Sequence, residues 1–161
     1  YTTFSYKWSD TEDIEGQPLA LTTADLQSRA SIDHQVEVTN TGTIAGDCVV
    51  MAFAVAQQNF HGTNRDEVGA PLKSLFGFQR LHDMAPGEKR SVLFSSTADD
   101  LSIVDTGGHR WLKKRRFSIE IGDVLVPARR EVVVEGNERL LEAAGPWADV
   151  AAAYLSGATS K

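Results

Sequence analysis

The residues that could do chemistry are scattered along the chain and form no recognisable catalytic motif. The four histidines stand singly, without the paired spacing or the cysteine partners of a zinc site. They are His34, His61, His82 and His109. We therefore predict no metal site and no cofactor. Strand alternation places His34 on an inward face, which favours a hydrogen-bonded core histidine over a ligand.

Carboxylates, serines and the single cysteine also fall short of a catalytic centre. Asp99, Asp100 and Asp105 could suggest the carboxylate pair of a glycosidase, but they occupy turn positions, where aspartate commonly caps the backbone. No serine stands in a GxSxG elbow. Cys48 begins an apolar run, which favours an inert thiol over a nucleophile. We predict that this chain holds no catalytic residue.

Two features leave a role in binding open. The basic run 113–116 (KKRR) could hold a phosphate or a sulfated sugar, but its place between two strand segments favours a solvated hairpin tip or strand edge. Phe60 and His61 lie at the tip of a long polar loop, residues 57–71. An aromatic residue on such a loop either folds back to anchor the loop or reaches a ligand or partner, and both interpretations stay open.

Composition limits the class of protein. A chain of 161 residues is long enough for one domain with a real core. Its net charge of -6 argues against general attraction to nucleic acid or anionic membranes. No apolar run approaches the roughly 18–20 residues of a membrane span. The expected partners therefore include neither nucleic acid nor membrane.

Apolar residues recur mostly at every second position, which predicts short β-strands. Their number and the regular turn signals favour an all-β, antiparallel sandwich. We expect 72–81 and 88–96 to form a hairpin across Pro86-Gly87, and 110–112 to pair with 117–121. The remaining strands are expected at 1–8, 19–23, 32–38, 48–55 and 131–135, with a short irregular segment at 101–104.

Two of these strands carry apolar residues on both faces, which a sandwich standing alone in water would normally avoid. They are residues 48–55 (CVVMAFAV) and 72–81. We predict that one set of side chains fills the sandwich and the other meets a neighbouring domain. The candidates for this domain interface are Met51, Phe53, Leu72, Phe76 and Phe78.

The last 26 residues have a different pattern. Pro146 suits the first turn of a helix, and the apolar residues that follow recur at helical spacing as far as Leu155. This predicts one amphipathic helix of about ten residues, too short to be stable unless it docks. We therefore divide the chain into a β-sandwich, residues 1–135, and a C-terminal extension with a short helix, residues 136–161.

Five blocks of the sequence, in order and at matching spacing, resemble the C-terminal fibronectin type III-like domain of glycoside hydrolase family 3 enzymes. They are YTTFSY at the start, VEVTNTGTIAGDCVVMAFAV (36–55), PLKSLFGFQRLHDMAPGEKRSVLF (71–94), DDLSIVDTGGHR (99–110) and FSIEIGD (117–123). The combination of GAPLKSLFGFQR with LSIVD is most similar to the β-xylosidase and α-L-arabinofuranosidase branch, and a β-glucosidase type is the alternative. The resemblance implies an immunoglobulin/fibronectin type III-like β-sandwich.

The resemblance also implies where the chemistry lies. In such enzymes the catalytic residues belong to an earlier barrel and α/β sandwich domain, so none maps onto this chain. The expected function is that of a non-catalytic accessory domain that stabilises those catalytic domains in a glycosidase of plant cell-wall oligosaccharides. The alternative is a carbohydrate- or surface-binding module. A secreted protein is expected, with a vacuolar or cytoplasmic one left open.

By position, the loop 57–71 matches a family loop that can approach the active site. The resemblance therefore makes Phe60, His61, Asn64 and Arg65 candidates for a place near an oligosaccharide substrate. The chain departs from the family at Lys114-Arg115, where a Pro-Gly turn is usual, and at Cys48, where an acidic residue is common. The tail from Gly136 onward has no counterpart in the resemblance.

Overall fold

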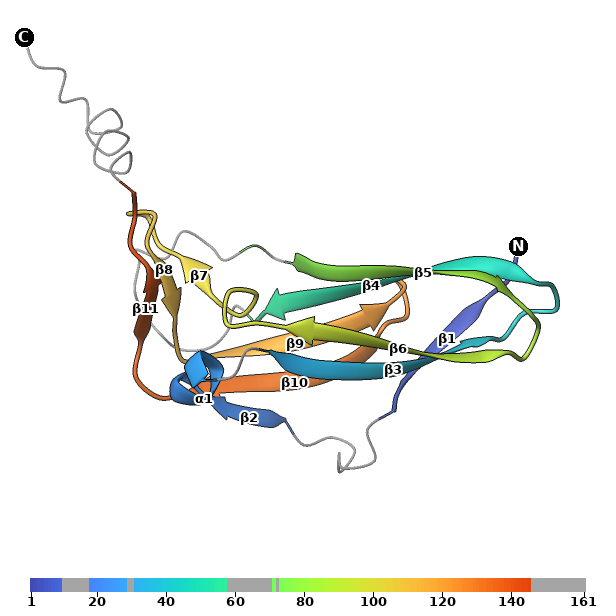
Figure 1. Ribbon diagram of the computed structural model, residues 1–161, viewed down its shortest axis with the longest axis horizontal. Coiled ribbons are helices and arrows are strands. Elements are labelled where there is room, and N and C mark those ends of the chain that lie inside the picture. The colour runs from blue at the N-terminus through green and yellow to red at the C-terminus, as the bar shows by residue number, and fades with distance from the viewer. Residues whose placement is uncertain (10–17, 29–30, 58–70, 72, 146–161) are drawn as a thin grey trace, which may run out of the picture.

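A computed structural model describes residues 1–9, 18–28, 31–57, 71 and 73–145. Two sheets pack face to face, and a small third sheet lies at one end of the sandwich (Figure 1). The first sheet has the order β1 (Phe4–Trp8), β3 (Ile32–Asn40) and β6 (Lys89–Ser96). The second runs β2 (Leu19–Thr22), β10 (Ala128–Glu135), β9 (Arg115–Gly122), β4 (Gly46–Ala56) and β5 (Ser74–Met84). The third runs β11 (Arg139–Glu142), β8 (Arg110–Leu112) and β7 (Ile103–Val104).

The predicted all-β sandwich is confirmed. Every strand pair is antiparallel except β2 with β10, which is parallel. The one helix of the described residues, α1 (Thr23–Ser28), is much too short to cross a membrane.

The core lies between the two large sheets and is built from alternate residues of their strands. Each strand turns one row of side chains inward because successive residues of a β-strand point to opposite faces. The fully buried side chains from both sheets include Val36, Val38, Val50, Val92, Ile119, Ile121, Val132 and Val134. His34 is also fully buried, and its Nε2 lies 2.8 Å from the Ser96 hydroxyl. The prediction of a hydrogen-bonded core histidine is thus confirmed.

Strands β5 and β6 do not form the predicted hairpin. They follow each other across the Pro86-Gly87 turn, but β5 pairs with β4 in one sheet and β6 pairs with β3 in the other. The connection therefore crosses from sheet to sheet. Alternation along each strand correctly indicated that Val92 and Phe94 face inward, yet it carries no information about which strand is the partner.

The pairing predicted for 110–112 with 117–121 is also wrong. Strand β8 pairs with β7 and β11 in the small sheet, whereas β9 pairs with β10 and β4. Arg115 and Arg116 consequently belong to β9 and not to a hairpin tip. Strand β11 was not predicted, and it falls within the segment assigned to the extension. The helix predicted over 146–155 lies outside the described residues, so the division at residue 135 stays a prediction.

Helix α1 was missed, although the sequence contains a signal for it. The Thr22 hydroxyl accepts a hydrogen bond from the Asp25 amide, and the Asp25 carboxylate accepts one from the Thr22 amide, at 3.0 Å each. This reciprocal arrangement is a capping box, in which two otherwise unpaired amides at a helix start are satisfied. The motif TTAD at 22–25 could therefore have identified the start of α1.

Candidate functional site

The main candidate site is an apolar area on the outer face of β4 and β5. Strand register places Met51 beside Phe78 and Phe53 beside Leu75, all on the side of the sheet away from the core. Phe78 is 72% exposed, Leu75 53% and Val49 46%, while Met51, Phe53 and Val55 are half-buried. We call these six residues the β4–β5 face: Val49, Met51, Phe53, Val55, Leu75 and Phe78.

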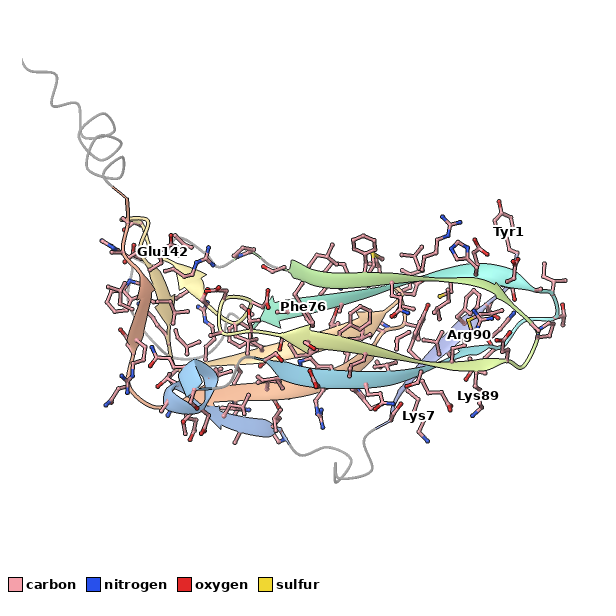
Figure 2. The ribbon with its side chains drawn as sticks, in the orientation of Figure 1. Tyr1, Lys7, Phe76, Lys89, Arg90 and Glu142 are labelled. Carbon is pink, nitrogen blue, oxygen red and sulfur yellow. The ribbon has the colours of Figure 1, made fainter. Side chains whose placement is uncertain are left out.

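A bulge in β5 separates Phe76 from this face. Ala52 pairs with Gly77 and the next residue, Phe53, pairs with Leu75, so Phe76 is the extra residue of β5. Its side chain packs against the core, with its ring centroid 5.9 Å from that of His34 (Figure 2). The structure therefore brings Met51, Phe53 and Phe78 together among the predicted interface residues. Phe76 lies on the opposite side of the sheet, and Leu72 lies outside the described residues.

Charged side chains border the β4–β5 face at two places. On the β9 side, the Lys73 ammonium lies 2.7 Å from the Glu120 carboxylate and 4.3 Å from the ring centroid of Phe53. Arg129 donates to the other oxygen of Glu120 at 2.9 Å. At the Val49 end, the Asp47 carboxylate accepts a hydrogen bond from Arg80 at 2.7 Å and lies 3.2 Å from the His82 ring. The site therefore has an apolar centre and an ion-paired border.

Asp47 has a second role in this border, because it supports an unusual backbone conformation. Asp83 is the one residue other than glycine with a positive φ in the described chain, at 49°. Its amide donates to Asp47 Oδ1 at 3.1 Å. This backbone hydrogen bond, followed by those of Arg80 and His82, lowers the pKa of Asp47 from 3.8 to about 2.

The Asp47 contacts predict an acid-dependent loss of stability. A carboxylate whose pKa is lower in the folded state stabilises the fold above its unfolded pKa, and this contribution is lost as the pH falls toward the folded value. We expect the urea midpoint of the wild type to decrease as the pH is lowered from about 4 to about 2. The midpoint of Asp47→Asn should decrease less steeply over the same pH window. Asp99→Asn, a change at an exposed turn aspartate, is the control. Equal slopes for wild type and Asp47→Asn would contradict the assignment.

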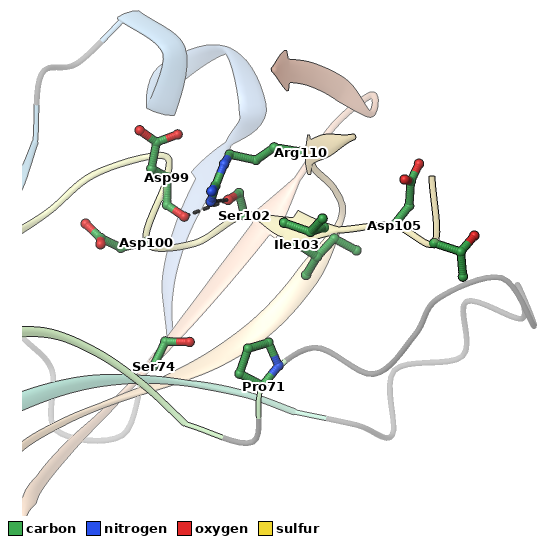
Figure 3. Close-up of a pocket in the computed structure, with 10 residues that line it drawn as sticks. Pro71, Ser74, Asp99, Asp100, Ser102, Ile103, Asp105 and Arg110 are labelled. Atoms are coloured by element: carbon green, nitrogen blue, oxygen red, sulfur yellow. Dashed lines mark hydrogen bonds between the residues drawn. The ribbon is translucent and has the colours of Figure 1, made fainter. Parts of the chain in front are cut away.

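A second candidate is an open pocket of about 580 Å³ beside the third sheet (Figure 3). Several of its polar side chains are engaged with one another or with turns. Asp100 accepts hydrogen bonds from the Thr97 amide and hydroxyl at 2.7 and 2.8 Å, and Arg110 donates to the Ser102 hydroxyl at 3.1 Å. These contacts give Asp100 and Arg110 structural roles in the wall of the pocket.

Asp105, another residue of this pocket, is also occupied. Its carboxylate accepts hydrogen bonds from the His109 amide and from the Trp111 indole, both at 2.9 Å. The predicted turn roles of Asp100 and Asp105 are therefore confirmed, and Asp99 lies in the same turn as Asp100. Within the described ranges, no three histidine, cysteine, aspartate or glutamate side chains come together in a way that could hold a metal ion.

The basic run 113–116 faces carboxylates from β10 and the segment after it. Lys113 lies 4.0 Å from Glu138, Lys114 3.9 Å from Glu135, and Arg116 3.0 Å from Glu131. These acidic partners reduce the local positive charge that an anion site would need. The distances therefore favour a structural role for the run.

Cys48 has the surroundings of an inert thiol. Its side chain is buried, and its Sγ atom lies 3.3 Å from the Tyr6 hydroxyl. Burial raises the pKa of the Cys48 thiol, so the neutral form dominates near neutral pH. The loop candidates Phe60, His61, Asn64 and Arg65 lie outside the described residues, and their proximity to a substrate stays a prediction.

The described tryptophans do not form a shared platform for sugar binding. Trp8 belongs to β1 and packs against the core, with its ring centroid 6.0 Å from that of His34. Trp111 belongs to β8 in the third sheet and is held by Asp105. The two rings therefore serve different parts of the fold.

Fold and site together define a mostly antiparallel β-sandwich domain with an exposed apolar area on the outer face of β4 and β5. The comparisons with known proteins agree with the fold. Residues 55–123 match the family model described as the fibronectin type III-like domain. The chain carries a fibronectin type III-like domain, and the resemblance found in its sequence is confirmed.

The relatives of this chain are much longer proteins. It is 32% identical over 125 residues to a beta-xylosidase of Formosa agariphila, covering 76% of this chain and 14% of that protein. It is 28% identical to an exo-1,4-beta-xylosidase of Emericella nidulans, covering 88% and 18%. The chain thus spans less than a fifth of the length of these relatives.

Solved structures show the same relation. A beta-glucosidase from Kluyveromyces marxianus in complex with glucose matches with a TM-score of 0.62 and 25% identity, over 89% of this chain and 15% of that one. A beta-glucosidase from Listeria innocua in complex with gluconolactone matches with a TM-score of 0.63 and 21% identity, over 84% and 16%. In both, the sandwich corresponds to a small part of a larger chain.

Proposed function

We propose that this chain is a non-catalytic accessory domain of a longer glycosidase of the β-xylosidase type. The observation that carries the proposal is that the chain matches a small section, 14% to 18%, of several proteins named as β-xylosidases. The catalytic groups of the parent protein would then lie in its other domains, a barrel and an α/β sandwich. This domain would stabilise them by packing against them.

The names of the same relatives support a xyloside substrate for the parent protein. Exo-acting xylosidase chemistry would release single sugars from oligosaccharides of the plant cell wall. The plant cell-wall polysaccharides from which such oligosaccharides come lie outside the cell, which supports a secreted parent protein. The described side chains support a role in packing and not in catalysis, since Asp100, Asp105 and Cys48 are all engaged in structural contacts.

The proposal is tested by removing the domain from the longer polypeptide that its gene encodes. We expect the isolated chain to release no nitrophenol from nitrophenyl β-xyloside above buffer. We also expect a parent protein that lacks these residues to lose most of its xylosidase activity or its thermal stability. Nitrophenyl β-glucoside, assayed in parallel, distinguishes a glucosidase parent from a xylosidase. Turnover by the isolated chain, or a truncated parent with unchanged activity and stability, would reject the proposal.

A further inference from the structure

We infer that the β4–β5 face is the surface on which a neighbouring domain of the same polypeptide docks. This inference rests on the proposed function. That function does not say which surface of the domain is used for packing, and the inference names it. The first observation is a contrast within one sheet. On its β9–β10 half the outward side chains form ion pairs, Arg129 with Glu120 and Arg116 with Glu131. On its β4–β5 half the outward side chains are apolar from Val49 to Val55 and at Leu75 and Phe78, and the charged residues stand at the border.

The outer face of the other large sheet shows what a solvated face of this sandwich looks like. Across β3 and β6, Gln35 donates to the Ser91 hydroxyl at 2.7 Å, and Lys89 pairs with Glu37 at 2.8 Å. Leu93, 56% exposed, stands among these polar pairs as an isolated apolar residue. Single exposed apolar residues are ordinary on a protein surface, whereas a contiguous apolar area marks an interaction site.

The turn between β9 and β10 also exposes apolar side chains, at the level of one end of the face. Val124, Leu125 and Val126 are 57%, 85% and 71% exposed. Strand β9 ends at Gly122 opposite Met51, so the turn leaves the sheet level with the Val49 end of β4. Within this turn the Asp123 carboxylate accepts a hydrogen bond from the Leu125 amide at 2.7 Å.

The β4–β5 face and its border have the anatomy of a protein–protein interface. Such interfaces have an apolar centre, often aromatic, and a polar border. Phe78 is the most exposed large residue of the face, with Met51 directly beside it and the Lys73–Glu120 and Arg80–Asp47 pairs on opposite sides. Large aromatic side chains near the centre of an interface frequently carry much of its binding energy.

The occupant is a covalently linked domain, because the matched relatives continue far beyond the section that this chain covers. A linked domain binds at a high effective concentration, so a patch of this modest size can hold it in place. A second copy of the chain would have to assemble from dilute solution without that advantage. Self-association therefore becomes an outcome that the experiment must detect.

The test places an arginine at the most exposed residue of the face in the full-length polypeptide. Phe78→Arg should release this domain from its neighbour, because an arginine buried in an apolar contact is desolvated without a partner. We expect limited proteolysis to separate the domain from the full-length variant at least about tenfold faster than from the wild type. A tenfold change corresponds to a loss of about 1.4 kcal/mol of docking free energy. Leu93→Arg, the matched change on the opposite sheet, should leave the rate unchanged.

Measurements on the isolated chain make the result interpretable. Both side chains are exposed there, so we expect both variants to unfold at the wild-type urea concentration.

If Phe78→Arg and Leu93→Arg release the domain at the same rate from an active full-length glycosidase, the docking surface is wrong and the accessory function stands. A gene that encodes no catalytic domain would reject the function itself. A wild-type isolated chain that dimerises, with Phe78→Arg restoring the monomer, would assign the face to a second copy and overturn the inference.

Discussion

Gly122→Ala is expected to lower the free energy of unfolding by roughly 2–5 kcal/mol, because the substitution incurs two separate penalties. Gly122 has a φ of 133°, a backbone conformation that residues with a side chain rarely adopt. A Cβ atom at this position would also lie 2.6 Å from the ring of Tyr6. The backbone and the ring would both have to move.

Tyr6 has little freedom to move away. Its strand, β1, is paired along its whole length with β3, and its hydroxyl contacts the buried Cys48. A shift of the ring would therefore disturb both the edge of the first sheet and the core. This arrangement is the reason that we expect a larger effect than for most glycines in turns.

Urea unfolding at neutral pH measures the effect, and Gly87→Ala is the matched control. Gly87 also has a positive φ, 75°, but nothing lies within 4 Å of a Cβ atom built there. This variant therefore carries only the backbone penalty, about 1 kcal/mol. Losses of the same size for the two variants would show that the contact between Gly122 and Tyr6 contributes nothing.

Asn40→Asp is expected to destabilise the chain by roughly 2–4 kcal/mol, because it removes two buried hydrogen-bond donors. Asn40 is the last residue of β3 and is 1% exposed. Its amide nitrogen donates to the backbone carbonyls of Ile44 and Met84 at 2.9 and 2.8 Å. A carboxylate would instead place negative charge against these two oxygens.

The other half of the Asn40 amide is also used. Its Oδ1 atom accepts hydrogen bonds from the Thr2 hydroxyl at 2.6 Å and the Gly42 amide at 2.9 Å. Asn40 thus joins the N-terminal segment, the turn between β3 and β4, and the end of β5. Alanine at this position would leave these groups without partners, so Asn40→Ala should also be strongly destabilising.

The pH dependence separates the two Asn40 variants. Aspartate regains a donor when it is protonated, and the repulsion from two carbonyls should raise its folded pKa above its unfolded value. The loss of stability of Asn40→Asp relative to wild type should therefore be smallest below about pH 4 and should grow as the pH rises. Asn40→Ala should show a deficit with no such dependence. Thr41→Ala, at an exposed neighbouring position, is the control and should change stability by about 0.5 kcal/mol or less.

Much of this fold could be predicted from local patterns in the sequence. Period-two alternation identified the inward rows of β3, β6 and β9, because the pleat of a strand alone decides which neighbours share a face. Turn chemistry identified the roles of Asp100 and Asp105, since aspartate caps the backbone within a few residues of itself. The apolar run that begins at Cys48 likewise indicated an inert thiol.

Features that depend on distant residues needed the tertiary structure. Strands β5, β6 and β8 belong to three different sheets, and distant partner strands decide which sheet each one joins. Alternation carries no information about those partners. The four contacts of Asn40 come from three separate segments, so its sequence context, NTG, indicated only a turn.

The residues of the candidate interface show the same division most clearly. The sequence alone determined that strands 48–55 and 72–81 carry more apolar side chains than one core can use. Strict alternation then grouped Phe76 with Phe78. Only the tertiary structure revealed the bulge that lets one extra residue into β5, turning Phe76 into the core and leaving Phe78 outside. A bulge reverses the phase of alternation because it inserts one extra residue into the strand. The position of the bulge is set by pairing with the neighbouring strand, and not by the residues of the strand itself.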